Sequence, residues 1–247
     1  MRVVIITGGS RGIGASTARQ CALQGMGVVI TYNSNPEAAA SVVEGIEAEG
    51  GRAAALRLDV ADIASFAPFA EEVRVTLASK WKRADFDALV NNAGFGIYNP
   101  IAAVTEAEFD GLFAVHLKGP FFLTQALLPI IADGGHIVNL SSATARVATA
   151  GVAPYASLKG GLEVLTRYMA KEFGERRIRA NSIAPGAIRT ELSGGLNDEF
   201  EALLAGQTAL GRVGEPDDVG EAIAGLLSDG SRWVNAQNIE VAGGYII

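Results

Sequence analysis

The chain has 247 residues, of which 49% are hydrophobic, and its formal net charge is −7. This length suits one large α/β domain over residues 1–247 whose core needs no disulfide or metal to hold it together. The single cysteine, Cys21, excludes an internal disulfide and a zinc site built from several cysteines. The acidic balance argues against binding to nucleic acids or anionic membranes, and no apolar run is long enough to span a bilayer. Because the first residues show no signal-peptide pattern, we expect a cytoplasmic protein.

Short β-branched runs alternate along the chain with longer segments of helical period. The predicted strands are 2–7, 28–32, 53–58, 86–91, 136–140, 178–184 and 238–241. The predicted helices are 12–24, 37–49, 63–79, 106–131, 154–173 and 216–227. Several strands are apolar throughout, which is typical of parallel strands covered by helices on both faces. The alternation therefore predicts an α/β fold with right-handed crossovers and a doubly wound parallel sheet.

The segment 189–212 shows only a weak pattern. It is too long for an ordinary connection between two elements. We interpret it as a substrate loop, either a functional lid or a small helical insert within the single domain.

Residues with special chemistry follow five of the predicted strands: Gly8, Asp59, Asn91, Ser142 and Pro185. In an open α/β sheet, ligands bind beyond the carboxyl ends of the strands. These five ends therefore indicate where a site forms.

A glycine-rich turn, Thr7-Gly8-Gly9-Ser10-Arg11-Gly12-Ile13-Gly14, links the first strand to the first helix. Glycine permits positive φ and a close approach of the backbone to a pyrophosphate, and the N-terminus of a helix attracts an anion. The spacing is G-x-x-x-G-x-G, which differs from the common G-x-G-x-x-G fingerprint. The alternative is a tight turn with no ligand.

The second strand ends in Tyr32-Asn33-Ser34 and carries no acidic residue there. An NAD site usually has a carboxylate at this point to accept a hydrogen bond from the ribose 2′-hydroxyl. Arg11 in the glycine-rich turn favours a 2′-phosphate instead, with Asn33 and Ser34 as small donors. The pattern thus indicates NADP rather than NAD, against the alternative of a solvated turn with a surface arginine.

Two further motifs follow later strands. Asn91-Asn92-Ala93-Gly94 permits side-chain bridges and close approach of a ligand, although an Asx turn explains it equally well. Tyr155 and Lys159 lie four residues apart on one face of a predicted helix. A cation beside a phenol lowers the pKa of the phenol, so Tyr155 can act as a general acid or base, with Ser142 donating to a substrate oxygen.

Taken together, these motifs resemble the short-chain dehydrogenase/reductase family in its compact single-domain form, and the resemblance covers the whole chain. It implies a Rossmann-like sheet of seven strands and hydride transfer between NADP(H) and an alcohol/carbonyl pair. Tyr155 would protonate the carbonyl oxygen, Ser142 would orient it, and Lys159 would bind the nicotinamide ribose. The resemblance also implies a homotetramer. We expect no metal in the site.

The resemblance also implies a set of cofactor-binding residues. Asp59 and Val60 would hold the adenine. Asn91 through Gly94, with Asn91, Ala93 and Gly94 as the binding residues, would flank the adenosine ribose and brace the sheet. Pro185, Gly186, Ile188 and Thr190 would face the nicotinamide. The predicted cofactor site is completed by residues of the glycine-rich turn and of the second strand end: Gly8, Ser10, Arg11, Gly12, Ile13, Gly14, Asn33 and Ser34.

His116 departs from the family pattern, which usually has Asn at this point of the sequence. That Asn helps to carry a proton relay through water, and an imidazole can also hold a water as donor or acceptor. An unperturbed imidazole has a pKa near ~6.5, so its acceptor would be lost on acidification. The alternative is a histidine that only satisfies a backbone carbonyl.

The substrate remains open between several carbonyl compounds. We expect NADPH-dependent reduction of a small or medium ketone, aldehyde or keto ester. Alternatives are a 3-oxoacyl-[acyl-carrier-protein] reductase, to whose acidic partner Arg176 and Arg177 would offer part of a basic patch, and a sugar dehydrogenase. A catalytically silent module that senses NADP is the alternative of another class. We expect the substrate pocket to be lined by residues 95–98, 144–152 and 192–204.

Overall fold

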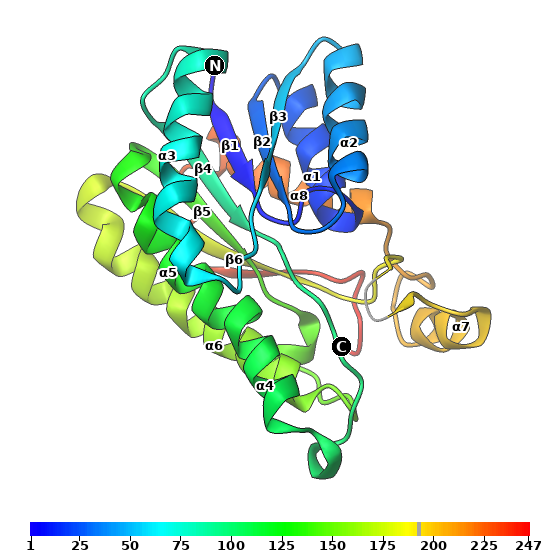
Figure 1. The fold of residues 1–247 in the computed structure, drawn as a ribbon. Helices are drawn as coiled ribbons and strands as arrows, with labels where there is room; N and C mark the ends of the chain where they lie inside the picture. Colours follow the sequence, from blue (N-terminus) through cyan, green and yellow to red (C-terminus); the bar gives the residue numbers. More distant parts are fainter. Residues whose placement is uncertain (192–193) are drawn as a thin grey trace.

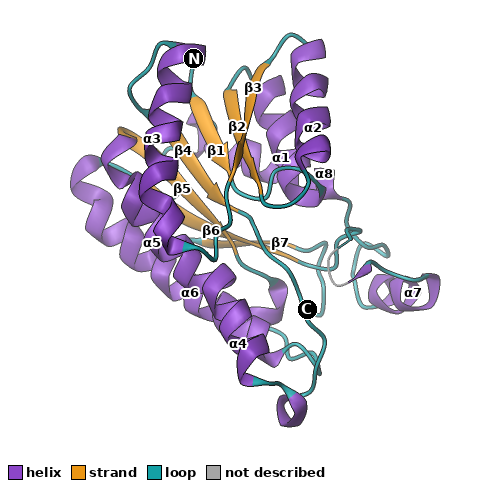
Figure 2. Ribbon diagram, viewed as in Figure 1, coloured by secondary structure: helices purple, strands orange, loops and turns teal. Residues whose placement is uncertain are grey.

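A computed structural model of the chain describes residues 1–191 and 194–247. Within them a seven-stranded, wholly parallel sheet runs in the order β3-β2-β1-β4-β5-β6-β7 (Figure 2). Its strands are β1 (Val3–Ile6), β2 (Gly27–Tyr32), β3 (Arg52–Arg57), β4 (Phe86–Asn91), β5 (Ile131–Leu140), β6 (Arg179–Pro185) and β7 (Asn238–Val241). This order confirms the predicted doubly wound, Rossmann-like α/β fold.

Helices cover both faces of the sheet, so that three layers form (Figure 1). One outer layer holds α1 (Gly12–Leu23), α2 (Pro36–Ala48) and α8 (Pro216–Leu227). The other holds α3 (Phe66–Thr76), α4 (Glu106–Phe113), α5 (Gly119–Leu127) and α6 (Ala153–Glu172). Among the described helices, none is long and apolar enough to cross a membrane.

The first strand shows why its sequence is apolar without alternation. Val3 and Ile5 pack into the cluster beneath α3 and α5, whereas Val4 and Ile6 pack into the cluster beneath α1 and α8. All four side chains are fully buried. Burying one such side chain stabilises the fold by about 1.5–3 kcal/mol, so both layers gain from the same short strand.

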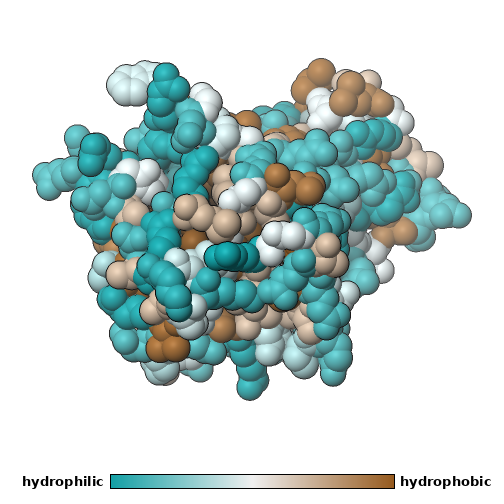
Figure 3. Space-filling view, turned by 90° about the horizontal axis from the view of Figure 1, so that it is seen from above, coloured by the Kyte–Doolittle hydropathy of each residue, from teal (hydrophilic) through white to brown (hydrophobic). Residues whose placement is uncertain are grey.

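Figure 3 views the molecule from above, and the face that it shows is largely hydrophilic with scattered apolar residues.

The predicted helix 106–131 is interrupted in the structure. A π-helical turn, Ala114–Lys118, separates α4 from α5, and the amide of Gly119 donates to the carbonyl of Ala114. Pro120 explains the interruption, because it has no N–H to donate to the carbonyl of His116 four residues earlier. The same helix ends earlier than predicted, since β5 begins at Ile131 rather than at His136.

The weakly patterned segment 189–212 contains a further helix, α7 (Asp198–Gly206), which stands away from the sheet (Figure 1). The Asn197 side chain caps it by accepting from the amide of Phe200. Its first turn carries Asp198, Glu199 and Glu201, which suit the positive end of the helix dipole. A helical insert is therefore present, and its role as a lid stays a prediction. Leu192 and Ser193, in the predicted substrate lining, lie outside the described residues.

Candidate active site

The glycine-rich turn between β1 and α1 is tightly packed. Gly8 has a φ of +64°, and a Cβ added there would lie 2.9 Å from the Cα of Ala93. A Cβ added to Gly14 would collide with the carbonyl oxygen of Gly8. The N-terminus of α1 has no side-chain cap and no acidic residue in its first turn. Its amide groups are therefore suited to an anion, and the turn fits the pyrophosphate of a dinucleotide.

The Asn-Asn-Ala-Gly motif after β4 holds this turn in place. The Asn92 side chain donates to the carbonyls of Thr7 (2.8 Å) and Gly8 (3.1 Å). In return the Thr7 hydroxyl accepts from the amides of Asn92 (2.9 Å) and Ala93 (3.0 Å). Asn92 is therefore a positioning residue for the glycine-rich turn.

Asn91 points the other way, into the sheet. Its amide donates to Asn139 Oδ1 (2.8 Å) and to the Thr124 hydroxyl (3.3 Å), and the Asn139 amide donates to Thr166. These buried groups satisfy one another between β4, β5, α5 and α6. The side chain of Asn91 thus braces the sheet, as the family resemblance implied, and its part in ribose binding stays a prediction.

The predicted adenosine end lies beyond β2 and β3. Asn33 and Ser34 are exposed there, and Asp59 accepts from the amide of Ala61 within its own turn. The Arg11 side chain, 74% exposed, forms an ion pair of 3.1 Å with Glu191. Arg57, which no sequence motif marks, also lies here, and its Nε donates to the carbonyl of Asn33.

The segment after β6 lies against the glycine-rich turn. The Thr190 methyl would be 3.5 Å from a Cβ on Gly12. Gly186 packs so closely on Ala242 that a Cβ would lie 2.8 Å away, and Ile188 forms a bridge with Gly214. The predicted nicotinamide side and the predicted phosphate side of the site are therefore neighbours.

Ser142, Tyr155 and Lys159 come together at the junction of β5 and α6. The Ser142 hydroxyl and the Tyr155 hydroxyl form a hydrogen bond. Ser142 Oγ accepts from the Thr144 amide (3.2 Å) and the Thr144 hydroxyl (2.9 Å). Lys159 Nζ donates to the Leu140 carbonyl and lies 5.4 Å from the centre of the Tyr155 ring. The predicted trio is thus one cluster.

Burial governs the protonation of this cluster. It raises the pKa of Tyr155 to about 12, and the hydrogen bond with Ser142 opposes the rise only partly. It also lowers the pKa of Lys159 to about 7. The pKa of Tyr155 therefore moves opposite to our expectation, because desolvation of the phenolate exceeds the favourable contacts in this structure. A tyrosine that keeps its proton at neutral pH is suited to donate it to a carbonyl.

His116 adjoins the cluster from the π-helical turn and is 1% exposed. Its ring meets the Tyr155 ring edge-on, with centroids 5.0 Å apart. Its Nε2 lies 2.7 Å from the Phe95 carbonyl oxygen and 3.4 Å from the Phe95 amide nitrogen. The shorter contact decides the tautomer: a carbonyl only accepts, so Nε2 carries the proton. Nδ1 is then an acceptor, buried and without a partner among the described residues.

The pKa of His116 is lowered to about 3, chiefly by burial and further by the charge of Lys159. We expected the acceptor nitrogen of His116 to be lost by protonation near pH ~6.5, and this expectation is wrong. The imidazole stays neutral throughout the range in which enzymes usually work.

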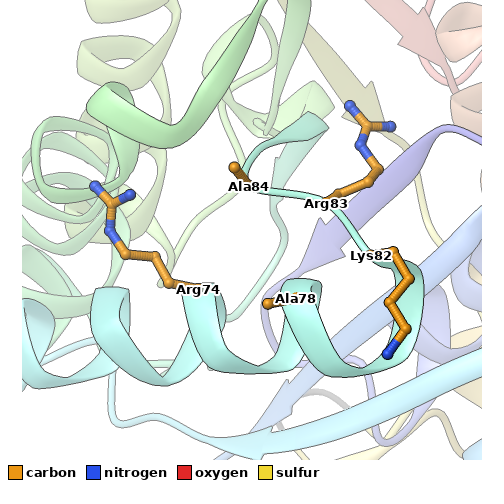
Figure 4. Close-up of a pocket in the computed structure, with 5 residues that line it drawn as sticks. All are labelled: Arg74, Ala78, Lys82, Arg83 and Ala84. Atoms are coloured by element: carbon orange, nitrogen blue, oxygen red, sulfur yellow. The ribbon is translucent and has the colours of Figure 1, made fainter.

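A surface hollow of about 500 Å³ lies elsewhere, beside the start of β4 (Figure 4). Arg74, Ala78, Lys82, Arg83 and Ala84 line it. Arg83 is held by Asp85 and Asp87. The cluster of Ser142, Tyr155 and Lys159 stands at the carboxyl end of β5, so this hollow forms no part of it.

Comparison with known proteins agrees with this geometry. Residues 8–246 match the family model described as enoyl-(acyl carrier protein) reductase. The 3-oxoacyl-[acyl-carrier-protein] reductase of Staphylococcus aureus is 36% identical over 243 residues, which cover 97% of this chain and 96% of the relative.

Two solved structures have the same fold. The angucycline C-6 ketoreductase LanV with bound NADP is 33% identical, with a TM-score of 0.95 over 99% of this chain and 95% of the other. A short-chain dehydrogenase/reductase from Serratia marcescens is 29% identical, with a TM-score of 0.92 over 100% and 98%. With the glycine-rich turn and the Ser142, Tyr155 and Lys159 cluster in place, the chain belongs to the short-chain dehydrogenase/reductase family, whose members are oxidoreductases.

Proposed function

We propose that the protein reduces a ketone, aldehyde or keto ester to an alcohol with NADPH. The observation that carries this proposal is the buried cluster of Ser142, Tyr155 and Lys159 beside an uncapped glycine-rich turn. NADPH, when bound, supplies the hydride. The ketoreductase with bound NADP supports both the cofactor and the class of substrate.

The hydrogen bonds in the cluster assign the role of each side chain. Ser142 Oγ already accepts twice from Thr144, so its own hydrogen forms the bond with Tyr155 and can turn to a substrate oxygen placed beside the two hydroxyls. The protonated Tyr155 hydroxyl gives its proton to the same oxygen as negative charge develops there. Lys159, held by the Leu140 carbonyl, places a positive charge beside the phenolate that this transfer leaves.

The rate of reduction should depend on the charge of Lys159. Its pKa is lowered from 10.5 to about 7, so its proton is present below that pH and is lost as the pH rises through it. We therefore expect kcat for reduction, measured at saturating NADPH, to fall as the pH rises above about 7. A profile that stays flat to about pH 9 would show that a charged Lys159 is not needed.

Arg11 is the proposed reader of the 2′-phosphate. Its partner Glu191 is equally exposed, so the ion pair is weak and a phosphate can replace the carboxylate. Arg11→Ala should weaken NADPH binding by about 10-fold, the lower end of the range for hydrogen bonds to charged groups. NADH affinity should hardly change. Titration of both cofactors by fluorescence measures this, and equal losses for the two would show that Arg11 does not read the phosphate.

The second candidate is reduction of a 3-oxoacyl group on an acyl carrier protein, which the Staphylococcus aureus relative favours. Two features of this chain oppose it. Arg176 is bound to Asp133 and to the Leu128 carbonyl at the amino-terminal side of β6, away from the cluster. In addition, the first turn of α7 carries three acidic residues, and an acidic partner would be repelled by them.

A panel of substrates decides among these functions. Loss of NADPH should be followed with small ketones, aldehydes, keto esters, sugars and an acetoacetyl thioester. We expect turnover with uncharged carbonyl compounds. Turnover only with the thioester would favour the carrier-protein role, and turnover only with sugars would favour a sugar dehydrogenase. NADPH binding without turnover of any compound would indicate a silent sensor.

We propose a homotetramer in the cytoplasm as the working form. Four exposed aromatic side chains lie on one helical layer: Phe109 and Phe113 on α4, Phe121 on α5 and Tyr168 on α6. Trp233, before the start of the edge strand β7, and Ile247, after its end, are also almost fully exposed. Exposed apolar residues on the helical face and around the edge strand suit contacts with further copies of the chain.

A further inference from the structure

Arg57 is the last residue of β3, the edge strand next to β2. The parallel register pairs it with Tyr32, the last residue of β2, and the amide of Leu58 donates to the Tyr32 carbonyl. Leu56 and Leu58 point into the core beneath α3, so Arg57 between them points to the opposite face. The side chain therefore reaches over the end of β2, where Asn33 and Ser34 stand.

One contact fixes the position of the guanidinium. Its Nε donates to the main-chain carbonyl of Asn33 at 3.3 Å. An arginine has five N–H donors, so both terminal nitrogens of Arg57 stay available for a ligand. Within residues 1–191 and 194–247 the side chain forms no ion pair, and the nearby Asp59 is engaged with its own turn. Arg57 thus presents a positive charge that no ion pair occupies among the described residues, although Asp59, Asp62 and Glu72 line the same surface hollow.

Arg11 differs in this respect. It approaches the same ligand from the glycine-rich turn, but its Nη1 is bound to Glu191. A phosphate that recruits Arg11 must break this ion pair, whereas Arg57 needs no such exchange. A planar fork with free N–H groups is also the geometry that binds phosphate oxygens in pairs.

The geometry points to Arg57 as a second specificity-determining residue for the 2′-phosphate of NADP(H), acting from β3 opposite Arg11. This inference rests on the proposed cofactor. The Asn33 carbonyl anchors the guanidinium, so the charge is positioned before the cofactor arrives and costs little ordering on binding. The β2 end lacks a basic residue of its own, and Arg57 supplies that charge from the neighbouring strand.

Binding of the full-length protein tests the inference without catalysis. NADPH, NADH, adenosine 2′,5′-bisphosphate and AMP are titrated against wild type, Arg57→Ala and Arg57→Lys. We expect Arg57→Ala to raise the Kd of NADPH and of the bisphosphate by about 5- to 10-fold, after discounting hydrogen bonds to a charged group for solvent exposure. The Kd values of NADH and AMP should hardly change. Arg57→Lys should recover part of the loss, and more salt should shrink the difference.

The chain offers a matched control in Arg52, the exposed arginine that begins the same strand at its far end. Arg52→Ala should leave all four Kd values unchanged, and thermal melts should show that each variant is folded. If Arg57→Ala keeps the wild-type preference for NADPH, or weakens NADPH and NADH equally, Arg57 only braces the edge of the sheet and the inference is overturned. A wild-type protein that binds NADH as tightly as NADPH would overturn the proposed cofactor, and the inference with it.

Discussion

Replacement of Tyr155 by phenylalanine should lower kcat by about 10²–10⁴-fold, the range in which general acid catalysis contributes. The change keeps the ring beside His116 and removes only the hydroxyl that bonds with Ser142. Packing and cofactor affinity should therefore stay close to wild type. Steady-state turnover of a ketone, together with a fluorescence titration of NADPH, separates the two effects.

Tyr168→Phe is the matched control, because Tyr168 lies on the same helix and is exposed. It should leave kcat unchanged. If Tyr155→Phe retained near-normal turnover, another group would be the proton donor and the assignment of Tyr155 would fail.

The strands and the residues at their carboxyl ends could be predicted from the sequence, because both depend on local signals. Four consecutive apolar residues in Val3–Ile6 require cover on both faces, and a glycine-rich turn between a strand and a helix has few other uses. Ser142 and Tyr155 lie far from the turn in sequence, but parallel strands bring their ends to the same edge.

The protonation states could not be predicted in this way. They depend on burial by residues that are distant in sequence, and burial changed the direction expected for Tyr155 and the value expected for His116. Arg57 was missed for a related reason. Nothing in its own strand distinguishes it from Arg52, and only the register between β2 and β3 places it over Asn33.

His116→Leu should slow turnover by up to about 100-fold, the lower end for loss of a proton-transfer step, if the imidazole anchors a water of the proton relay. Nε2 is committed to the Phe95 carbonyl, so Nδ1 is the atom that can accept from such a water beside Lys159. Leucine removes the acceptor, whereas Asn restores one and should preserve much of the activity. NADPH affinity should remain nearly intact in both variants, and kcat and Kd measured separately check this.

The pH profile and a second histidine complete the test. His116 has its pKa lowered to about 3, so wild type and His116→Asn should show the same acid limb down to about pH 5. His136 is equally buried, has its pKa lowered to about 3 by desolvation, and bonds with Asn181 inside the sheet. His136→Asn should therefore reduce thermal stability without slowing turnover. If His116→Leu turned over as fast as wild type and differed only in stability, then His116 would serve the Phe95 carbonyl alone, and the relay would have to leave Lys159 by another path.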